Sequence, residues 1–283
     1  MGIFSDVLLT VDYDRTLTGP DSTIPQRNLD AIRYFIDNGG AFTVNTGRSV
    51  PMSVRDIIPV VPLSAPLLLY NGSAAYDPVA KKITQSFPID LKPKVIIEDL
   101  QEHFPDMNME VQDVDSHYLC KKNPGWEAYC ENNGCAWAYV DTHAVPQPFL
   151  KLAVYGEFRK NTVASMFEAS DAEMQRFEEL MQYVANRYGE KVEVFRACPR
   201  IVDIHAKGCS KLNAARHLQR AMGRKILVCV GDAKNDLSML EGADYAFCPA
   251  DGVVADSFPN VCNCGEGAVA DVIYKKIPEI LGK

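Results

Sequence analysis

The chain has 283 residues, of which 47% are hydrophobic and 23% charged, and its 29 basic and 37 acidic residues give a net charge of −8. This length suits two domains, or one domain with a large insertion. The negative charge argues against nucleic acid or an anionic membrane as the main partner, and no run approaches the roughly 18 apolar residues of a membrane span.

The N-terminal part of the chain predicts alternating strands and helices. An apolar run at residues 7–11 leads directly into Asp12 and Asp14, and its Val and Leu content is typical of a buried parallel strand. Residues 23–26 resemble a capping box with an early proline. Apolar residues at helical spacing follow and predict a helix that stops at residues 38–40.

Two further strands are predicted before residue 80, and both end in polar turns. Residues 41–45 form a strand that ends in Thr46 and Gly47. The Thr46 hydroxyl and the Gly47 amide are groups that could donate hydrogen bonds to phosphoryl oxygens. Residues 67–70 form the next strand, which ends in an Asn-Gly turn signal.

The middle of the chain, residues 83–200, has a different pattern. It holds both tryptophans, and its short segments alternate polar and apolar residues, which indicates an antiparallel sheet with one solvated face. The predicted strands are residues 108–111, 116–119, 150–155 and 191–195, and the main predicted helix is residues 171–188. We therefore predict a separate α+β module in this region.

The α/β pattern resumes after residue 201. A helix at residues 210–222 precedes an apolar strand at 226–230 that leads into Asp232 and Asp236. A short helix, a further strand and a closing helix follow, at residues 237–240, 245–248 and 268–277. The predicted fold is α/β, a doubly wound parallel-sheet core of residues 1–82 and 201–283 with residues 83–200 inserted as an α+β cap.

The two acid pairs therefore follow strands of one sheet, and ligands of such sheets bind at the carboxyl ends of the strands. Carboxylates gathered there repel one another and lose water, so a hard cation such as Mg²⁺ is expected to neutralise them. The chemistry indicated is phosphoryl transfer through an aspartyl-phosphate on Asp12. Lys211, at a predicted helix start, adds a cation at an end of the helix that attracts anions.

The order of these motifs resembles the haloacid dehalogenase superfamily, whose pattern is a DxDxT strand end, a Thr or Ser strand end, a Lys and an acidic GDxxND loop. The NTGR and NGS segments, the long insertion and the GDAKND run resemble the Cof-type branch, with its α+β cap. The resemblance spans the whole chain. It implies a Mg²⁺-dependent phosphatase acting on a small phosphorylated metabolite, with sugar phosphates the leading class.

The resemblance also implies a role for each residue. Asp12 attacks the phosphorus, and the Asp14 carboxyl protonates the leaving alcohol and then activates water. The metal is held by the Asp12 carboxylate, the main-chain carbonyl of Asp14 and Asp232. The phosphoryl oxygens are bound by Thr46, Gly47, Lys211 and Asn235, and the supporting residues are Arg48 and Asp236, with Asp236 orienting Lys211 or a metal-bound water.

Two positions depart from the family pattern. Arg15 stands where the family usually has Gly, and the sequence leaves open whether this cation reaches the substrate. The loop at residues 248–252 replaces the Asn-Ala that Cof-type members usually carry there. Two less favoured site candidates are Lys207, read as an exposed loop residue, and His205, read as a structural histidine.

Two alternatives to the phosphatase remain open. A phosphomutase would use the same aspartyl-phosphate but return the phosphoryl group to its substrate. A non-enzymatic phospho-acceptor, like a response-regulator receiver, also combines acids, a Thr and a Lys, but lacks an acid at the position of Asp14. That carboxyl therefore favours an enzyme.

The nine cysteines are scattered with no CxxC pair, and no signal peptide is visible at the N-terminus. We therefore expect reduced thiols in a cytoplasmic protein. The expected partner is the small phosphorylated substrate alone, with the protein monomeric or weakly self-associating.

Overall fold

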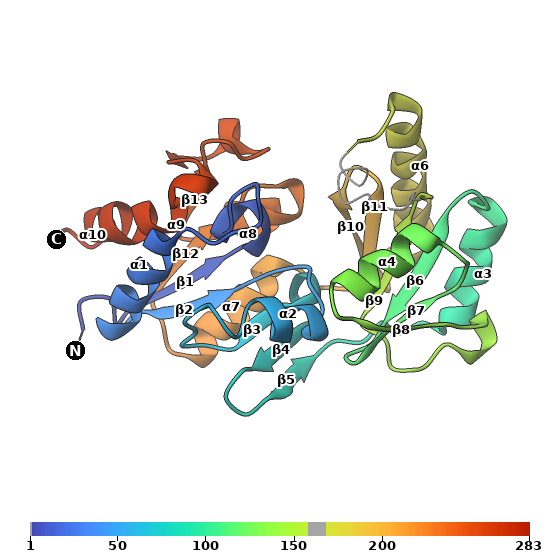
Figure 1. Cartoon of the computed structure of the whole chain (residues 1–283), viewed down its shortest axis with the longest axis horizontal. Coiled ribbons are helices and arrows are strands. Elements are labelled where there is room, and N and C mark those ends of the chain that lie inside the picture. The colour runs from blue at the N-terminus through green and yellow to red at the C-terminus, as the bar shows by residue number, and fades with distance from the viewer. Residues whose placement is uncertain (1, 158–167) are drawn as a thin grey trace. The chain divides into compact units, whose positions relative to one another are not determined.

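The computed structural model describes residues 2–157 and 168–283, and the contacts within it divide the chain into two units (Figure 1). The first unit comprises Met1–Gly47, Ile58–Gln85 and Ser210–Lys283. The second comprises Arg48–Ile57 and Ser86–Cys209.

A parallel sheet forms the centre of the first unit. Its strand order is β14-β13-β12-β1-β2, with bounds Asn260–Val261, Tyr245–Pro249, Ile226–Val230, Val7–Val11 and Ala41–Val44. Val11 is in register with both Val230 and Val44, so the three central strands end side by side. All five residues of β1 are buried, as the continuous apolar run predicts for a central strand covered on both faces.

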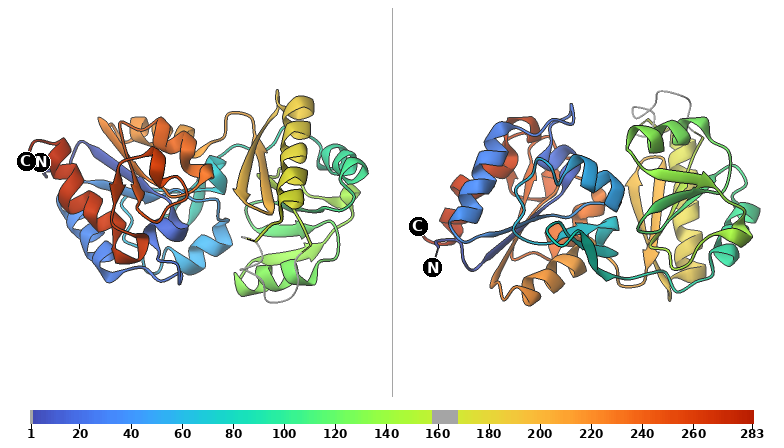
Figure 2. Two further views of the ribbon diagram at one scale, coloured as in Figure 1. Left: turned by 90° about the horizontal axis from the view of Figure 1, so that it is seen from above. Right: turned by 60° about the horizontal axis from the view of Figure 1, so that its bottom comes forward.

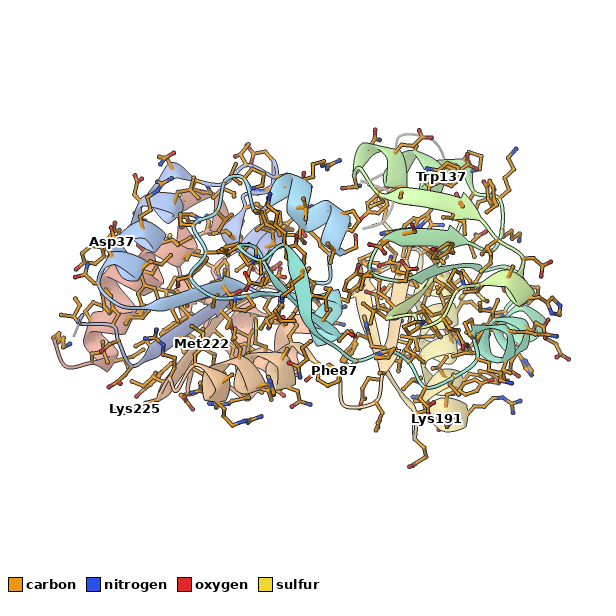
Figure 3. The ribbon with its side chains drawn as sticks, turned by 90° about the horizontal axis from the view of Figure 1, so that it is seen from below. Asp37, Phe87, Trp137, Lys191, Met222 and Lys225 are labelled. Carbon is orange, nitrogen blue, oxygen red and sulfur yellow. The ribbon has the colours of Figure 1, made fainter. Side chains whose placement is uncertain are left out.

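Helices cover both faces of this sheet (Figures 1 and 2). Helix α1 (Gln26–Asp37) packs against α9 (Ala268–Asp271), which continues through the wider turn Val272–Lys276 into α10 (Ile277–Ile280). On the other face α7 (Lys211–Ala221) packs against α8 (Leu237–Glu241) over Leu8, Leu227 and Cys229. Asp37 and Lys225 mark the end of the unit at which the strands begin, opposite their carboxyl ends (Figure 3).

A small antiparallel sheet extends this unit. It contains β3 (Leu67–Leu69), β4 (Ala74–Asp77) and β5 (Lys82–Ser86), and one parallel bridge between Asn45 and Leu68 joins it to the end of β2. The turn after β3 needs glycine, because Gly72 has a φ of 98° and a Cβ there would lie 2.3 Å from the carbonyl oxygen of Ser210. The Asn-Gly signal in the sequence therefore marks a real close approach to the start of α7.

The second unit is built on a mainly antiparallel sheet of order β10-β11-β9-β6-β7-β8, in which only the pair β7 and β8 is parallel among the described strands. The bounds in that order are Val192–Cys198, Ile201–Ala206, Lys151–Tyr155, Asn108–Gln112, Ser116–Leu119 and Ala136–Tyr139. One face carries Leu152 and Val154 and packs on α3 (Pro93–His103) and α6 (Asp171–Tyr188). The opposite face carries Tyr155 and packs on α2 (Val50–Asp56) and α4 (Pro124–Asn132).

The predicted fold class is confirmed, since a parallel α/β core and a separate antiparallel-rich unit are both present. The strand at 226–230 and the helix at 171–188 have the bounds that the sequence predicts. The capping-box prediction at residues 23–26 is wrong, because the N-cap of α1 is Pro25, which has no side-chain acceptor. Helix α6 instead carries a capping box, formed by Ser170 and Glu173.

The unit boundaries also differ from the predicted ones. Strand β11 (Ile201–Ala206) pairs with β9 and β10 of the second sheet, whereas the sequence pattern predicts that residues from 201 onward belong to the core. Residues 48–57, which include α2, group with the second unit as well. Among the described residues, no helix combines the length and apolar character needed to cross a membrane.

Candidate active site

Asp12 is positioned by the end of the central strand β1. Its backbone N–H donates to the carbonyl of Val230 on β12 at 2.9 Å, so the residue is held at the sheet edge where both strands finish. The chain then makes a tight turn over Tyr13–Leu17, within which Arg15 has a φ of 59°. This left-handed conformation favours glycine, which is the residue that the resemblance leads us to expect where this chain has Arg15.

Lys211 begins α7 and is buried, with its side chain directed into the acidic cluster. Its Nζ donates to Asp12 Oδ1 and to Asp236 Oδ1, both at 2.6 Å. Burial alone would lower the pKa of Lys211, but the carboxylates of Asp12 and Asp236 outweigh that effect and raise it. Lys211 is therefore a permanent ammonium at neutral pH and bridges two strand ends.

The loop after β12 is organised by Asp236. Its Oδ2 accepts hydrogen bonds from the backbone N–H groups of Asp232 (3.1 Å) and Ala233 (3.0 Å), while Oδ1 receives Lys211. A Cβ on Gly231 would lie 2.6 Å from the Cβ of Asp236, so only glycine fits beside this carboxylate. Both oxygens of Asp236 are thus engaged in holding the loop and the lysine.

Asp232 presents its carboxylate beside the same cluster. Its Oδ1 accepts a hydrogen bond from the Thr16 hydroxyl at 2.8 Å. Carboxylate oxygens of Asp12, Asp232 and Asp236 lie within 4.8 Å of one another, and all three residues are buried. Such proximity is unfavourable unless positive charge is supplied.

The pKa values record this excess of negative charge. Burial, with the charges of Asp236, Asp232 and Asp14, raises the pKa of Asp12 well above its usual value in spite of Lys211. Burial and Asp236 raise the pKa of Asp232 to about 7. A divalent cation would remove the imbalance, and an all-carboxylate donor set suits a hard ion such as Mg²⁺.

Asp14 and Arg15 occupy the exposed part of the turn after Asp12. Asp14 is close enough for its charge to raise the pKa of Asp12. Burial opposes the ionised form of Asp251, but hydrogen bonds from Cys264 and the charge of Arg15 lower the pKa of that carboxyl. The two positions that depart from the family pattern, Arg15 and the loop containing Asp251, are therefore electrostatically linked.

The remaining predicted residues have varied positions. Thr46 is buried just beyond β2, and its backbone N–H donates to Leu68 at 2.9 Å. Gly47 packs on the Asn71 side chain, because a Cβ there would lie 3.0 Å from Asn71 Oδ1. Asn235 lies in the short 3₁₀ turn Lys234–Asp236 that precedes α8.

Arg48 is not part of the acidic cluster's unit. It pairs with Asp56 of α2 at 2.8 Å and belongs to the second unit. The two less favoured candidates also belong to the second unit. Lys207 is half-exposed and pairs with Glu193 at 3.2 Å, and His205 is fully buried within β11.

Sequence reasoning missed two residues that support the site. Thr16 orients Asp232 through its hydroxyl. It could have been identified from the sequence, because it is the Thr of the DxDxT motif. Asn45 donates from Nδ2 to the Lys211 carbonyl at 2.9 Å, which ties the start of α7 to the end of β2. The sequence feature that could have identified Asn45 is an amide at the end of a mostly apolar strand.

The chain is similar to known proteins over most of its length. The family model described as haloacid dehalogenase-like hydrolase matches residues 9–254. A relative from Bacillus subtilis (strain 168), the 5-amino-6-(5-phospho-D-ribitylamino)uracil phosphatase YitU, is 22% identical over 261 residues, which cover 88% of each chain.

Two solved structures show the same fold. The structure of SMU.1108c from Streptococcus mutans UA159 has a TM-score of 0.78 at 16% identity and covers 95% of this chain and 98% of its own. The subclass IIB sugar phosphatase BT4131 has a TM-score of 0.73 at 17% identity, covering 97% and 98%. The similarity spans both units of the chain.

Proposed function

The chain belongs to the haloacid dehalogenase-like hydrolase family and is a phosphatase of that family, and from this premise we propose that it hydrolyses a small sugar or sugar-alcohol phosphate with Mg²⁺, through an aspartyl-phosphate on Asp12. The observation that carries the proposal is the bridge that Lys211 makes between Asp12 and Asp236. It fixes one oxygen of Asp12 and leaves the carboxylate at the edge of the sheet.

Asp12 is the proposed nucleophile. The Lys211 ammonium at 2.6 Å favours the carboxylate form that attack requires, and it offsets part of the charge of an incoming phosphate. Thr46, the Gly47 amide and Asn235 are proposed to donate to the remaining phosphoryl oxygens. Positioning and charge neutralisation of this kind are the main contributions that proteins make to phosphoryl transfer.

Asp14 is the proposed general acid and base. It lies in the turn directly after the nucleophile, and its exposure allows the carboxyl to exchange protons with solvent and substrate. In the first step it gives a proton to the leaving alcohol. In the second it takes a proton from the water that attacks the aspartyl-phosphate.

Mg²⁺ fits the donor set, and we propose Asp12, Asp232 and the Asp14 carbonyl as its ligands. We assign Asp236 a supporting role instead, because its oxygens already accept hydrogen bonds from Lys211 and two backbone amides. When bound, the ion supplies positive charge for the phosphoryl oxygens. Thr16 would keep Asp232 oriented toward it.

The proposed substrate class rests on the relatives. YitU is named for a substrate with a phosphorylated ribityl chain, and BT4131 is described as a sugar phosphatase. We propose that the inserted module, predicted at residues 83–200, selects among such phosphates, while the first unit performs the chemistry. Polar-to-Ala changes in that module should then shift kcat/KM between sugar phosphates while sparing an aryl phosphate.

The test is a hydrolysis screen of phosphorylated sugars, sugar alcohols, nucleotides and amino acids, with inorganic phosphate as the readout. Activity should disappear with a chelator, return with Mg²⁺ and return poorly with Ca²⁺, which is larger and accepts looser coordination. Activity indifferent to the chelator would refute the metal site. Product that is an isomerised phosphate, without inorganic phosphate, would establish a phosphomutase instead.

A second measurement tests Asp14. Asp14→Asn should slow both formation and breakdown of the aspartyl-phosphate, and it should slow alkyl phosphates more than an aryl phosphate, whose leaving group needs no proton. Equal losses for both substrate types would refute the acid and base role.

A further inference from the structure

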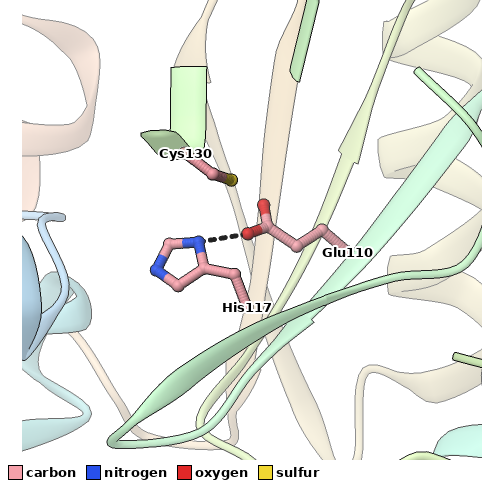
Figure 4. A group of neighbouring side chains, drawn as sticks. All are labelled: Glu110, His117 and Cys130. Carbon is pink, nitrogen blue, oxygen red and sulfur yellow. Dashed lines mark ion pairs between the residues drawn. The ribbon is translucent and has the colours of Figure 1, made fainter. Parts of the chain in front are cut away.

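A second group of potential metal ligands lies in the second unit and includes none of the residues assigned above to catalysis, phosphate binding or the first metal site (Figure 4). Glu110 projects from β6, His117 from β7 and Cys130 from the last turn of α4. All three are at most 1% exposed, and one ligand atom from each lies within 4.8 Å of the others.

Sheet register explains why these side chains meet. Glu110 is opposite Leu119 and His117 is opposite Gln112, so Glu110 and His117 project from the same face of the β6–β7 pair. That face also carries Leu119 and Tyr155, which pack with Cys130 and Trp126 of α4. The helix thereby sets its cysteine over the histidine and the carboxylate.

The polar atoms of Glu110 and His117 have partners both inside and outside the group. His117 Nδ1 is ion-paired with Glu110 Oε1, and Nε2 lies 3.1 Å from the Ser49 hydroxyl. Glu110 Oε2 accepts a hydrogen bond from Trp126 Nε1 at 2.7 Å, and the Trp126 ring stacks on Tyr155 with centroids 4.1 Å apart. Metal-binding histidines and carboxylates are typically held by such outer hydrogen bonds.

We propose that Glu110, His117 and Cys130 bind a divalent metal of the zinc type within the second unit. One carboxylate oxygen, one imidazole nitrogen and one sulfur form a mixed donor set that suits Zn²⁺ and disfavours Mg²⁺. Cys135 supplies a further thiol close to the group, since its Sγ lies 4.0 Å from the same Ser49 hydroxyl that contacts His117.

Charge balance is consistent with this site. Without metal, a carboxylate, an imidazolium and a neutral thiol carry no net charge. Zn²⁺ binding would release the imidazolium proton and the thiol proton, and the ion with a carboxylate, a neutral imidazole and a thiolate again carries none. The buried group would therefore gain a metal without burying additional net charge.

The competing explanation is a buried ion pair that serves only to hold β6 and β7 together, with Cys130 as an inert thiol. Burial raises the pKa of Cys130 to about 11, so without metal the thiol stays protonated. The two explanations differ in one observable, which is a bond between sulfur and metal.

The test uses the full-length chain, stripped of metal by a chelator and titrated with Co²⁺ in place of Zn²⁺. We expect one equivalent to produce a near-ultraviolet sulfur-to-cobalt charge-transfer band together with the visible bands of tetrahedral Co²⁺. Zn²⁺ should displace the cobalt, abolish the bands and raise the Tm. Co²⁺ bound by the aspartates of the first unit has no sulfur ligand, so it cannot produce the charge-transfer band.

Variants assign the ligands. Cys130→Ala should abolish the charge-transfer band, and His117→Asn should weaken Co²⁺ binding at least tenfold. The matched control is Cys209→Ala, which removes a buried thiol of the same unit that lies outside the group and should leave the band unchanged. A band reduced in Cys135→Ala as well would add Cys135 as a ligand.

Two results would overturn the site. One is a wild-type protein that shows no sulfur-to-cobalt band at any Co²⁺ concentration while remaining folded by circular dichroism. The other is a band that persists at full intensity in Cys130→Ala. Both results leave the proposed phosphatase untouched, because the two sites are tested by different variants. Asp232→Asn, in the first unit, should lower phosphatase activity and leave the sulfur-to-cobalt band intact.

Discussion

The two units each bury a group of ionisable side chains, and the groups differ in charge balance. In the first unit Asp12, Asp232 and Asp236 have one buried cation, Lys211, among them, and the pKa of Asp232 rises to about 7. In the second unit the carboxylate of Glu110 and the imidazolium of His117 are paired with each other. Although burial opposes both ions, His117 lowers the pKa of Glu110, and Glu110 raises that of His117.

The groups also differ in where the backbone places them. The aspartates follow strand ends, and the exposed Asp14 lies in the turn next to Asp12. Glu110 and His117 lie inside strands, beneath α4. A group with excess negative charge at the ends of the strands can bind a cation and, with it, a phosphate. A group without net charge inside a sheet can stabilise the fold, or bind a divalent metal that displaces two protons.

The largest expected effect tests the unbalanced group. Asp12→Asn should reduce phosphatase activity to below about 1% of wild type, because an amide cannot form the acyl-phosphate. The protein should remain folded, since the change removes one of several mutually repelling carboxylates. The measurement is kcat with an aryl phosphate, alongside Tm. Activity above that level would exclude Asp12 as the nucleophile.

Lys211→Met tests how much the single cation contributes. It leaves three buried carboxylates without an ammonium, so we expect a loss of stability of about 3–5 kcal/mol and of most activity. Mg²⁺ should restore part of the stability, because it supplies the missing charge. Urea unfolding with and without Mg²⁺ measures both effects.

The matched control is Lys207→Met, which removes a half-exposed lysine paired with Glu193 and should change stability by less than about 0.5 kcal/mol. Equal losses in the two variants would show that Lys211 has no special electrostatic role.

The sequence predicted the first group far better than the second. Strand 226–230 and the central strand at 7–11 are continuous apolar runs followed by acids, so pattern and motif agree on where the side chains meet. The parallel pairing of β1 with β12 then brings Asp12 and Asp232 to the same end of the sheet. Lys211 was identified through a motif, and its contacts with both acids follow from the start of α7.

The group of Glu110, His117 and Cys130 has no such signal. Its members come from two strands and a helix, and only the register of β6 on β7 and the packing of α4 bring them together. Strand β11 was misassigned for a related reason, because its sequence fits a core strand of either unit. The choice between the two units is made by the strands that pair with β11, and one of them, β9, is distant from it in the sequence.

Glu110→Gln tests the balanced group in metal-free protein. It removes one partner of a fully buried pair, so we expect a loss of about 3 kcal/mol, while phosphatase activity per folded molecule stays unchanged. The double variant Glu110→Gln/His117→Gln should lose less stability than the sum of the losses in the two single variants. Each single variant leaves one buried charge without its partner, whereas the double variant removes both charges. Additive losses would show that the two side chains are not coupled.

The effect that is smallest at neutral pH concerns His205, a histidine of the same sheet as His117 whose Nε2 lies 4.0 Å from a carboxylate oxygen of Asp203. His205 is fully buried on β11, and the neighbouring Asp203 is already paired with Lys151 at 3.3 Å. Burial, with the charge of Lys151, lowers the pKa of His205 to about 3. His205 is therefore neutral in the folded protein, whereas His117 is charged.

The sign of the pH effect follows from that difference. Between about pH 6.5 and pH 3 the unfolded chain binds a proton at residue 205 that the folded protein does not, so His205 lowers stability as the pH falls, by about 1.4 kcal/mol per pH unit. His205→Gln cannot take up that proton, so its unfolding free energy should fall less steeply than that of wild type across this range. Parallel pH profiles for the two proteins would mean that His205 takes up a proton in the folded state as readily as in the unfolded chain. Strand β11 would then tolerate a buried imidazolium, whereas the imidazolium of His117 is offset by the carboxylate of Glu110.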